Sequence, residues 1–487
     1  MNQSMIRYVL GGVLKIEAIF LVLPWLVAMI YHENVAVYYV AVASLCGLFG
    51  LLMTYKRPKS YVFYLKEGCL TTALSWILLS LFGAMPFFAS GEIPNYGDAL
   101  FETISGFTTT GASILENVEA LTHASLFWRS FTHWIGGMGV LVFLLAVIPM
   151  SGGGSMNLMR AESPGPSVGK LVPKIKTTAR ILYMIYFCMT LAEFLLLFFS
   201  GMRAFDAITL SFGTAGTGGF GVLADSVASY TYVQKWIITV FMILFGVNFN
   251  FYYYMIFRQF KKGFSMEEVR WYIIIILVAI GIIFFDIRHM YGGTFEGLTD
   301  AAFQVGSIIT TTGFSTVDFD LWPGLSRTIL VLLMFIGACA GSTGGGMKVS
   351  RGIIAVRTIK KEMLSYIHPK SVKKIKYEDK PVEHDVLRSL NVYIITYLFI
   401  FWISVLLISL NEHDLVTNFT AVAATFNNIG PGLSLVGPAR NFAFFSMPAK
   451  CLLMLDMLAG RLELFPMLIL FHPHIWKEFF TKRDDGE

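Results

Sequence analysis

The chain has 487 residues, of which 55% are hydrophobic and only 14% are charged. A soluble domain carries about 25% charged residues, so this composition excludes an ordinary soluble enzyme and indicates a polytopic integral membrane protein. The net charge of +5 is unevenly distributed, because 27 of the 37 Lys and Arg residues fall in five segments between or after apolar stretches.

The apolar stretches predict about ten membrane spans, since about 20 apolar residues cross the hydrocarbon core as a helix. In chain order they are Val9–Ile30, Val35–Thr54, Thr71–Phe88, Leu126–Met150, Ile181–Ser200, Val233–Phe257, Tyr272–Asp286, Arg327–Ile336, Val392–Leu410 and Phe442–Phe471. The five basic segments are Lys56–Lys66, Arg160–Arg180, Arg258–Arg270, Lys348–Arg388 and Lys477–Arg483. They alternate with sparsely basic connections, so the positive-inside bias predicts that these segments and both termini are cytoplasmic.

Four short polar stretches interrupt the apolar background on the sparsely basic side. They read Gly106-Phe-Thr-Thr-Thr-Gly-Ala-Ser113, Thr214-Ala-Gly-Thr-Gly-Gly-Phe-Gly221, Thr310-Thr-Thr-Gly-Phe-Ser-Thr316 and Asn427-Asn-Ile-Gly-Pro-Gly432. Each follows a short amphipathic segment that opens with a good helix N-cap, namely Asp98, Asp206, Asp300 and Asn418. About ten residues of helix span about 15 Å, which is half a membrane. The repeating unit is therefore a spanning helix, a half-helix entering from outside, a glycine loop and a second spanning helix.

Glycine loops in this setting suit a cation pore. A half-helix entering from outside turns the partial negative charge of its C-terminal end toward the axis, and glycine tolerates the φ values that expose carbonyl oxygens. One such loop alone could be an ordinary helix–helix turn, but four around one axis would replace the water shell of a large monovalent cation. The predicted ion-binding residues are Thr109, Thr110, Gly111, Gly216, Thr217, Gly218, Thr311, Thr312, Gly313, Asn428, Ile429 and Gly430, with Gly111, Gly218, Gly313 and Gly430 taken as equivalent.

The predicted fold is an all-α polytopic membrane protein with four helix, pore-loop, helix repeats in pseudo-fourfold arrangement around one pore. Two extra N-terminal spans occupy residues 1–60. Repeats 1 and 2 are predicted at residues 61–155 and 156–262. Repeat 3, at residues 263–378, includes a broken second helix and a cytoplasmic loop, and repeat 4 occupies residues 379–487.

Below the predicted filter, the second span of repeat 3 contains ten consecutive residues no larger than threonine, Gly337-Ala-Cys-Ala-Gly-Ser-Thr-Gly-Gly-Gly346. Consecutive glycines should break the helix, so an unwound, movable loop there would obstruct ions. The gate residues are predicted to be Gly341, Ser342, Thr343, Gly344, Gly345, Gly346 and Arg461. The alternative for the glycines is a close helix-packing motif.

Arg461 is the other unusual residue, because it stands within an apolar stretch, Leu458-Ala-Gly-Arg-Leu-Glu-Leu464. In a continuous helix it would lie well inside the bilayer, where ionisable residues usually face a water-filled path or a partner. A fixed positive charge near the permeation path would raise the barrier for cations. The alternative is a structural ion pair with Asp456 or Glu463.

These features resemble the Trk, Ktr and HKT superfamily of potassium transporters, and within it the bacterial TrkH family. The resemblance rests on the four single-glycine loops, on Trp134-Ile-Gly-Gly-Met-Gly139 after the first loop, on the glycine-rich break and on Arg461. It implies that K⁺ is the transported ion, without an organic cofactor, and that the glycine-rich segment is an intramembrane gate. Plant relatives with serine at the position of Gly111 prefer Na⁺, so Gly111 favours K⁺. The fourth loop departs from the pattern with Asn428 and Ile429 in place of threonines.

The resemblance also implies a homodimer in the bacterial inner membrane and a TrkA-like cytoplasmic ring that binds ATP, ADP or NAD. Segment Arg357–Lys380 is a candidate docking surface for that ring. A symporter coupled to H⁺ or Na⁺ is the alternative within transport, but Glu102 and Glu116 are expected at the outer margin of the first loop. A membrane receptor or an intramembrane hydrolase is the alternative of another class. The sequence offers no catalytic dyad for it, so we do not expect an enzyme.

Overall fold

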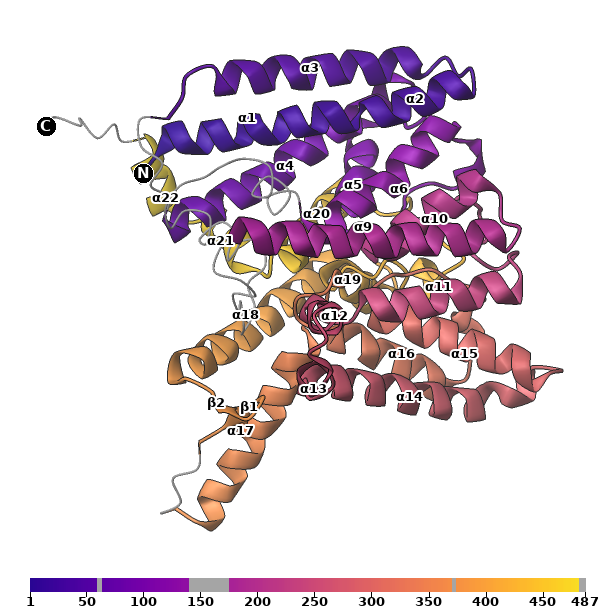
Figure 1. Ribbon diagram of the computed structural model, residues 1–487, viewed down its shortest axis with the longest axis vertical. Coiled ribbons are helices and arrows are strands. Elements are labelled where there is room, and N and C mark those ends of the chain that lie inside the picture. The colour runs from indigo at the N-terminus through magenta and orange to yellow at the C-terminus, as the bar shows by residue number, and fades with distance from the viewer. Residues whose placement is uncertain (59–63, 140–174, 370–373, 481–487) are drawn as a thin grey trace, which may run out of the picture.

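The computed structural model describes residues 1–58, 64–139, 175–369 and 374–480 (Figure 1). This part of the chain is mostly helical and contains one short hairpin, in which β1 (Lys376–Tyr377) pairs antiparallel with β2 (Lys380–Pro381). Long helices run side by side between the two ends of the molecule. The N-terminus and the last described helix, α22 (Pro473–Phe480), lie together at one end, where Lys66 pairs with Glu478.

The helices follow one another in a repeating order of long and short elements. They are α1 (Gln3–Phe20), α2 (Val22–Ile30), α3 (Ala36–Thr54), α4 (Leu65–Ala89), α5 (Tyr96–Phe107), α6 (His123–Met138), α9 (Ile175–Phe199), α10 (Ala204–Gly216), α11 (Tyr232–Phe245), α12 (Phe249–Ile256), α13 (Phe260–Phe264), α14 (Glu267–Ile287), α15 (Thr294–Ile309), α16 (Gly324–Ile336), α17 (Val349–Ile367), α18 (His384–Ile408), α19 (Leu415–Phe426), α20 (Met447–Arg461) and α21 (Phe465–Leu470). Short 3-10 turns occur at Val118–Ala120, Arg288–Met290, Phe319–Leu321, Ser409–Asn411 and Ser434–Val436.

Four sets of three helices follow α1 to α3, and each set has a spanning helix, a half-helix and a second inward helix. The sets are α4–α5–α6, α9–α10–α11, α14–α15–α16 and α18–α19–α20. They confirm the predicted all-α repeat architecture. The residue boundaries drawn between repeats stay a prediction, and the boundary between residues 155 and 156 lies outside the described residues, as does the second part of the predicted span Leu126–Met150.

The half-helices begin earlier than the sequence predicted. Their N-caps are Asn95, Arg203, Gly293 and Asp414, so the assignment of Asp98, Asp206, Asp300 and Asn418 as caps is wrong. Asp98 and Asp206 lie in the first helical turn, where a carboxylate also complements the helix dipole. Each of these two is held by an ion pair, with Lys450 and Arg203 respectively.

Two predicted spans are not continuous helices. Val233–Phe257 is bent by 93° between α11 and α12, where Asn248 caps the start of α12. Phe442–Phe471 becomes helical only in α20 and breaks again before α21. Pro466 explains the second break, because its ring would clash with the carbonyl group of Leu462, four residues earlier in a continuous helix.

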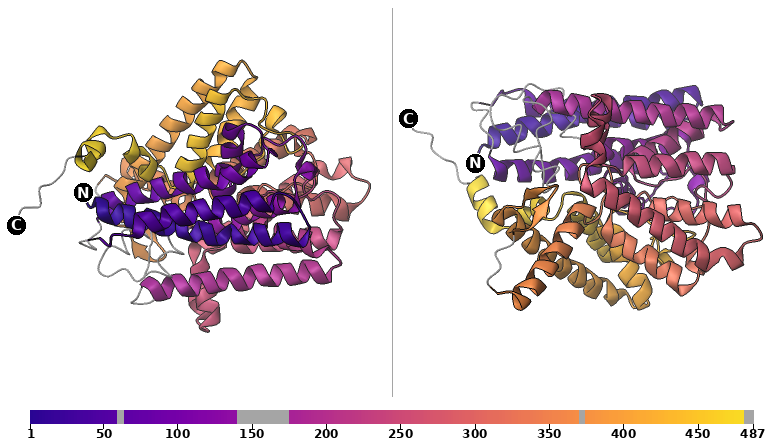
Figure 2. Two further views of the ribbon diagram at one scale, coloured as in Figure 1. Left: turned by 90° about the horizontal axis from the view of Figure 1, so that it is seen from above. Right: turned by 60° about the horizontal axis from the view of Figure 1, so that its bottom comes forward.

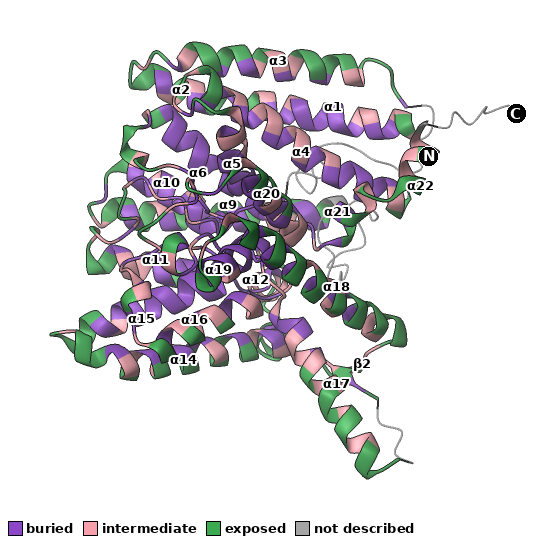
Figure 3. Ribbon diagram, turned by 180° about the vertical axis from the view of Figure 1, so that it is seen from behind, coloured by how far each residue is buried: buried purple, intermediate pink, exposed green. Residues whose placement is uncertain are grey.

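Six helices in the described part are long and apolar enough to cross a membrane, or up to seven if α11 and α12 form one bent span. The sequence predicted about ten because shorter inward helices such as α16 and α20 were counted as spans. Large apolar side chains are exposed on the outer helices, such as Leu51 in α3, Leu277 in α14 and Leu406 in α18. Figure 3 shows exposed residues along each of these helices. Exposed apolar surface on this scale suits lipid, so the chain is an integral membrane protein.

The loops after the half-helices meet in the middle of the molecule. In the right panel of Figure 2, the helices of the first half of the chain lie on one side and those of the second half on the other. The half-helices α5, α10, α15 and α19 are buried between them. This arrangement places the four glycine loops at one centre.

Candidate functional site

The four loops share one unusual backbone conformation. In each loop a non-glycine residue has φ near +55° to +60°, and these residues are Thr109, Thr217, Thr311 and Asn428. Two positions later a glycine has φ between +79° and +99°, and these residues are Gly111, Gly219, Gly313 and Gly430. L-residues enter this region at a steric cost. Its recurrence at equivalent places shows that all four loops turn their carbonyl groups in the same way.

The backbone hydrogen bonds fix the register of the second loop. The residue between the two left-handed positions donates its N–H group to a carbonyl group five residues earlier, in Thr110 to Ser105, Gly218 to Gly213, Thr312 to Ser307 and Ile429 to Ala424. Gly219 is therefore the counterpart of Gly111, and the prediction that gave this role to Gly218 is wrong by one residue. Gly216 ends α10, and its Cα faces His133 of α6.

The missing Cβ atoms show how the loops meet. A Cβ atom on each left-handed glycine would lie 1.9 to 2.8 Å from a carbonyl oxygen of the next loop. The contacts run from Gly111 to Gly218, from Gly219 to Thr312, from Gly313 to Ile429 and from Gly430 back to Thr110. The circuit is closed. We call these four glycines and the four carbonyl groups that they contact the glycine ring.

This packing makes the first position of the glycine ring testable. If the ring is the potassium filter that the sequence predicts, Gly111→Ser should lower the preference for K⁺ over Na⁺ by about tenfold, because its Cβ would displace the Gly218 carbonyl oxygen, 2.1 Å away. The check is a flux ratio measured in proteoliposomes with equal K⁺ and Na⁺ gradients. An unchanged ratio in a folded Gly111→Ser protein would contradict the assignment.

Side chains beneath the glycine ring hold its backbone. Thr108 bonds to Thr110 at 2.8 Å, and Thr310 bonds to Thr312 at 2.7 Å. In the fourth loop Asn428 takes over this function, because its amide donates to the Thr110 hydroxyl and to the Met457 carbonyl, both at 2.9 Å. The departure in the fourth loop is thus compensated by a cross-loop bond, while the ring receives the main-chain carbonyl of Ile429.

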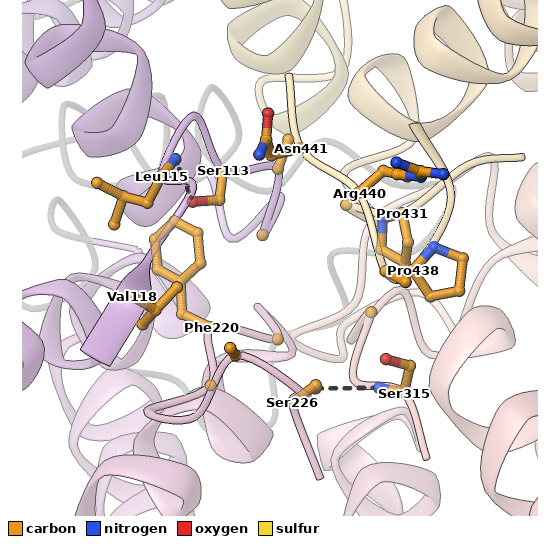
Figure 4. Close-up of a pocket in the computed structure, with 18 of the residues that line it drawn as sticks. Ser113, Leu115, Val118, Phe220, Ser226, Ser315, Pro431, Pro438, Arg440 and Asn441 are labelled. Carbon is orange, nitrogen blue, oxygen red and sulfur yellow. Dashed lines mark hydrogen bonds between the residues drawn. The ribbon is translucent and has the colours of Figure 1, made fainter. Parts of the chain in front are cut away.

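The outer side of the glycine ring opens into a cavity of about 140 Å³ (Figure 4). All four loops contribute to its wall, through Ser113, Phe220, Ser315 and Pro431 among others. In Figure 4 these side chains surround an open centre, and the Ser315 N–H donates to Ser226 at 3.2 Å. The cavity forms an outer vestibule directly above the ring.

A buried ion pair braces the first two loops. Glu102 in α5 accepts from the Arg129 Nε at 2.5 Å, from Ser113 at 3.0 Å and from the Ile114 N–H at 3.0 Å. The Glu102 side chain is fully buried, but its partners Ser113 and Arg129 line the cavity above the ring, so its place at the outer margin of the first loop stays a prediction. Arg129 continues the brace, donating to the Gly221 carbonyl at 2.9 Å. The sequence does show opposite charges, Glu102 and Arg129, on either side of the first glycine loop, but whether they pair depends on the fold.

His133 joins the same two loops from below. Its Nδ1 lies 2.7 Å from the Gly106 carbonyl oxygen, and its Nε2 accepts from the Phe220 N–H at 3.2 Å. These partners assign a neutral imidazole with the proton on Nδ1. The role of His133 could not be predicted from the sequence, since a lone histidine in an apolar helix does not indicate which groups it contacts.

The glycine-rich stretch is unwound. Helix α16 ends at Ile336 and α17 begins at Val349, and we call the intervening residues, Gly337–Lys348, the unwound segment. The predicted helix break is confirmed, and the alternative of a helix-packing motif at Gly337 and Gly341 is wrong. The Gly345 N–H donates to the Thr311 hydroxyl at 2.6 Å. The unwound segment therefore lies directly against the third glycine loop.

Arg461, the last residue of α20, connects the unwound segment to repeat 1. It donates to the Thr343 carbonyl at 2.8 Å and to the Gly136 and Gly137 carbonyls at 2.6 and 2.8 Å. Glu463, one of the predicted partners of Arg461, forms an ion pair with Arg351. Since α20 ends at Arg461, the continuous helix assumed in predicting its depth is wrong, but the residue still lies beside the unwound segment.

Comparisons with known proteins match this architecture over nearly the whole chain. The family model described as TrkH, cation transport protein, matches residues 32–480. The Trk system potassium uptake protein TrkH of Salmonella typhimurium is 37% identical over 470 residues, which cover 94% of this chain and 96% of that protein. The protein of the same name from Vibrio parahaemolyticus is 34% identical over 489 residues, covering 98% of this chain and 99% of that protein.

A solved structure agrees with these matches. The crystal structure of the potassium transporter TrkH from Vibrio parahaemolyticus superimposes with a TM-score of 0.88 at 32% sequence identity, covering 98% of this chain and all of that one. The four-repeat fold, the family model and the full-length relatives agree, and this chain belongs to the TrkH family of cation transport proteins.

Proposed function

We propose that this chain takes up potassium by conducting K⁺ through the glycine ring, one pore per chain, down its electrochemical gradient. The observation that carries the proposal is the closed circuit of four left-handed glycines and four main-chain carbonyl groups. Neutral carbonyl oxygens at the C-terminal ends of four half-helices suit a weakly hydrated monovalent cation. The names of the relatives, potassium uptake proteins, agree with this assignment and with a transporter rather than a receptor or a hydrolase.

We further propose that the unwound segment is the gate. It lies against the filter on the side away from the outer vestibule, and Arg461 holds it by the Thr343 carbonyl. In this position both the polypeptide and the positive charge oppose cation passage. Displacement of the segment would open the path.

The proposed setting is a bacterial inner membrane with both termini cytoplasmic, in a homodimer regulated by a TrkA-like ring that binds ATP, ADP or NAD. Helix α17 projects from the bottom of the bundle in Figure 1 and leans toward the left, the side on which the N-terminus also lies, and the hairpin lies beside it. The described residues of segment Arg357–Lys380 include Lys360, Lys361, Lys374 and Lys376, which line a basic pocket beside α17. A projecting basic surface is consistent with docking of an acidic partner.

The direct test is ion flux through the purified chain in proteoliposomes, with and without the partner ring. We expect K⁺ and Rb⁺ to pass and Na⁺ to pass at least about tenfold more slowly, because carbonyl rings favour the larger ions. The current should reverse at the potassium Nernst potential whatever the pH and Na⁺ gradient. Equal K⁺ and Na⁺ fluxes through the folded protein would contradict the filter assignment.

Symport with H⁺ is the second candidate, and one observation favours it. Glu193 in α9 is fully buried, and its carboxylate lies by the Thr214 side chain without an ion-pair partner among the described residues. A carboxylate in a spanning helix that packs on half-helix α10 could carry a proton. Coupling would make the reversal potential depend on pH, and Glu193→Gln would remove that dependence.

A further inference from the structure

Glu268 is a buried carboxylate that the proposed conduction path does not use. It is the second residue of α14, and its relative exposure is 1%. A carboxylate in the first turn of a helix complements that helix's dipole, which would be reason enough for an exposed glutamate. Full burial is costly unless specific partners compensate it, so the partners of Glu268 indicate what it does.

Two of those partners lie on either side of the glycine-rich part of the unwound segment. The Glu268 Oε1 accepts from the Ala340 N–H at 2.7 Å and from the Ser350 N–H at 3.0 Å. Ala340 stands near the beginning of the segment, and Ser350 stands in the first turn of α17, just beyond its end. One oxygen atom thus closes the loop at its base.

The start of α17 depends on this bond. Its N-cap residue, Lys348, has φ of +75° and provides no side-chain cap. The N–H groups in the first turn of a helix have no partner within the helix and are usually capped by a neighbouring Ser, Thr, Asp or Asn. Here the cap comes from another helix, because Glu268 accepts from Ser350.

The same carboxylate also reaches the bend in repeat 2. Its Oε2 accepts from the Asn248 amide at 3.4 Å. Two backbone bonds run alongside, from the Cys339 N–H to the Gly246 carbonyl and from the Phe249 N–H to the Gly341 carbonyl, each at 3.0 Å. The base of the unwound segment is therefore attached to the break between α11 and α12.

We propose that Glu268 is a positioning residue that anchors the unwound segment beneath the filter by holding both sides of its glycine-rich part on one carboxylate oxygen. Resting flux depends on this anchor only if the segment is the gate, so this consequence rests on the proposed function. Glu268 itself does not contact the glycine ring. Its loss should change how readily the path opens and leave ion selectivity unchanged.

The anchoring role can be tested without measuring flux, because the unwound segment contains a cysteine whose accessibility can be measured. Cys339 is fully buried, and its rate of modification by a membrane-impermeant maleimide, followed by peptide mass spectrometry on the full chain, reports displacement of the segment. We expect Glu268→Ala to increase this rate about tenfold and Glu268→Gln to keep it within about twofold of the parent, because glutamine retains an Oε1 that can accept both N–H bonds. Glu268→Asp, which is one methylene shorter, keeps the charge and should behave like Glu268→Ala.

The matched control is Glu267→Ala. It removes the neighbouring carboxylate, which pairs with Arg357 instead of with the unwound segment, and it should leave Cys339 as protected as in the parent. Unchanged protection in both Glu268→Ala and Glu268→Asp would overturn the anchor, as would equal exposure in Glu268→Gln and Glu268→Ala. If Glu268→Ala does not fold, the comparison of Glu268→Asp with Glu268→Gln decides.

Potassium flux through the same proteins then separates the anchor from the gate. With both proposals correct, Glu268→Ala raises flux about tenfold and keeps the K⁺ to Na⁺ ratio. If Cys339 is modified faster in Glu268→Ala but flux rises neither in Glu268→Ala nor in Arg461→Ala, the anchor is supported and the gate is refuted. A rise in flux in Arg461→Ala with Cys339 still protected in Glu268→Ala would support the gate and refute the anchor.

Discussion

Replacing Gly219 with alanine is expected to reduce potassium flux through the reconstituted chain by at least about tenfold, because left-handed backbone strain of about 1–2 kcal/mol is combined with a steric clash. Gly219 has φ of +80°, and an added Cβ would lie 2.0 Å from the Thr312 carbonyl oxygen. The main-chain carbonyl group of Thr312 cannot move aside as easily as the end of a flexible side chain. The displaced carbonyl is one of the four in the glycine ring, so both conduction and selectivity should suffer. Flux of K⁺ and Na⁺ in proteoliposomes measures both.

Two comparisons make the result specific. Gly281→Ala, in α14, meets no atom within 4 Å and should conduct like the parent. Gly218→Ala also creates a clash, but with the His133 ring, 2.2 Å away. Adding His133→Ala to Gly218→Ala removes that ring and should therefore restore flux. Adding His133→Ala to Gly219→Ala should restore less flux, because the clash there is with the main chain. Normal flux and selectivity in Gly219→Ala would show that the second loop has been aligned wrongly.

Arg461→Ala is expected to raise resting flux by about tenfold and to keep the K⁺ to Na⁺ ratio, since a change of about 1.4 kcal/mol shifts an equilibrium tenfold. The substitution removes a positive charge beside the path and three hydrogen bonds to carbonyl groups, including the one to Thr343 in the unwound segment. Each effect favours cation passage. Flux in proteoliposomes without the partner ring isolates the resting state.

Arg461→Lys separates these two effects. Lysine keeps the charge but lacks the planar fork that lets arginine bind carbonyl groups of α6 and of the unwound segment at once. A lysine variant as active as the alanine variant would assign the effect to the lost hydrogen bonds, and one like the parent would assign it to charge. Arg288→Ala, in the 3-10 turn that follows α14, is the control. Reduced or unchanged flux in a folded Arg461→Ala protein would contradict both roles.

Much of the fold could be predicted from the sequence because its signals are local. Apolar runs, basic connections and four glycine-bearing stretches predicted an all-α membrane protein with four repeats. The cap positions were wrong because Asp98 and Asp206 are equally favourable within the first turn, and propensity does not distinguish these places. The bend at Asn248 and the break before Pro466 were missed because long apolar composition outweighed single polar or proline residues.

The site was predicted less completely than the fold. Three loops were aligned correctly on Gly111, Gly313 and Gly430, but the second loop contains adjacent glycines, and only the backbone φ values and hydrogen bonds identify Gly219. The partners of Glu102 and Glu268 lie on other helices or far along the chain. Contacts of that kind depend on tertiary structure, and no spacing within one helix indicates them.

Because the glycine ring is contributed by one polypeptide, its quadrants can diverge independently. In a homotetrameric channel, one codon change alters every subunit at once. Here Ile429 can replace a threonine in one quadrant alone while Asn428 reaches across to the Thr110 hydroxyl. Selectivity in such a protein can evolve one quadrant at a time, because each substitution leaves the other three quadrants of the ring unaltered.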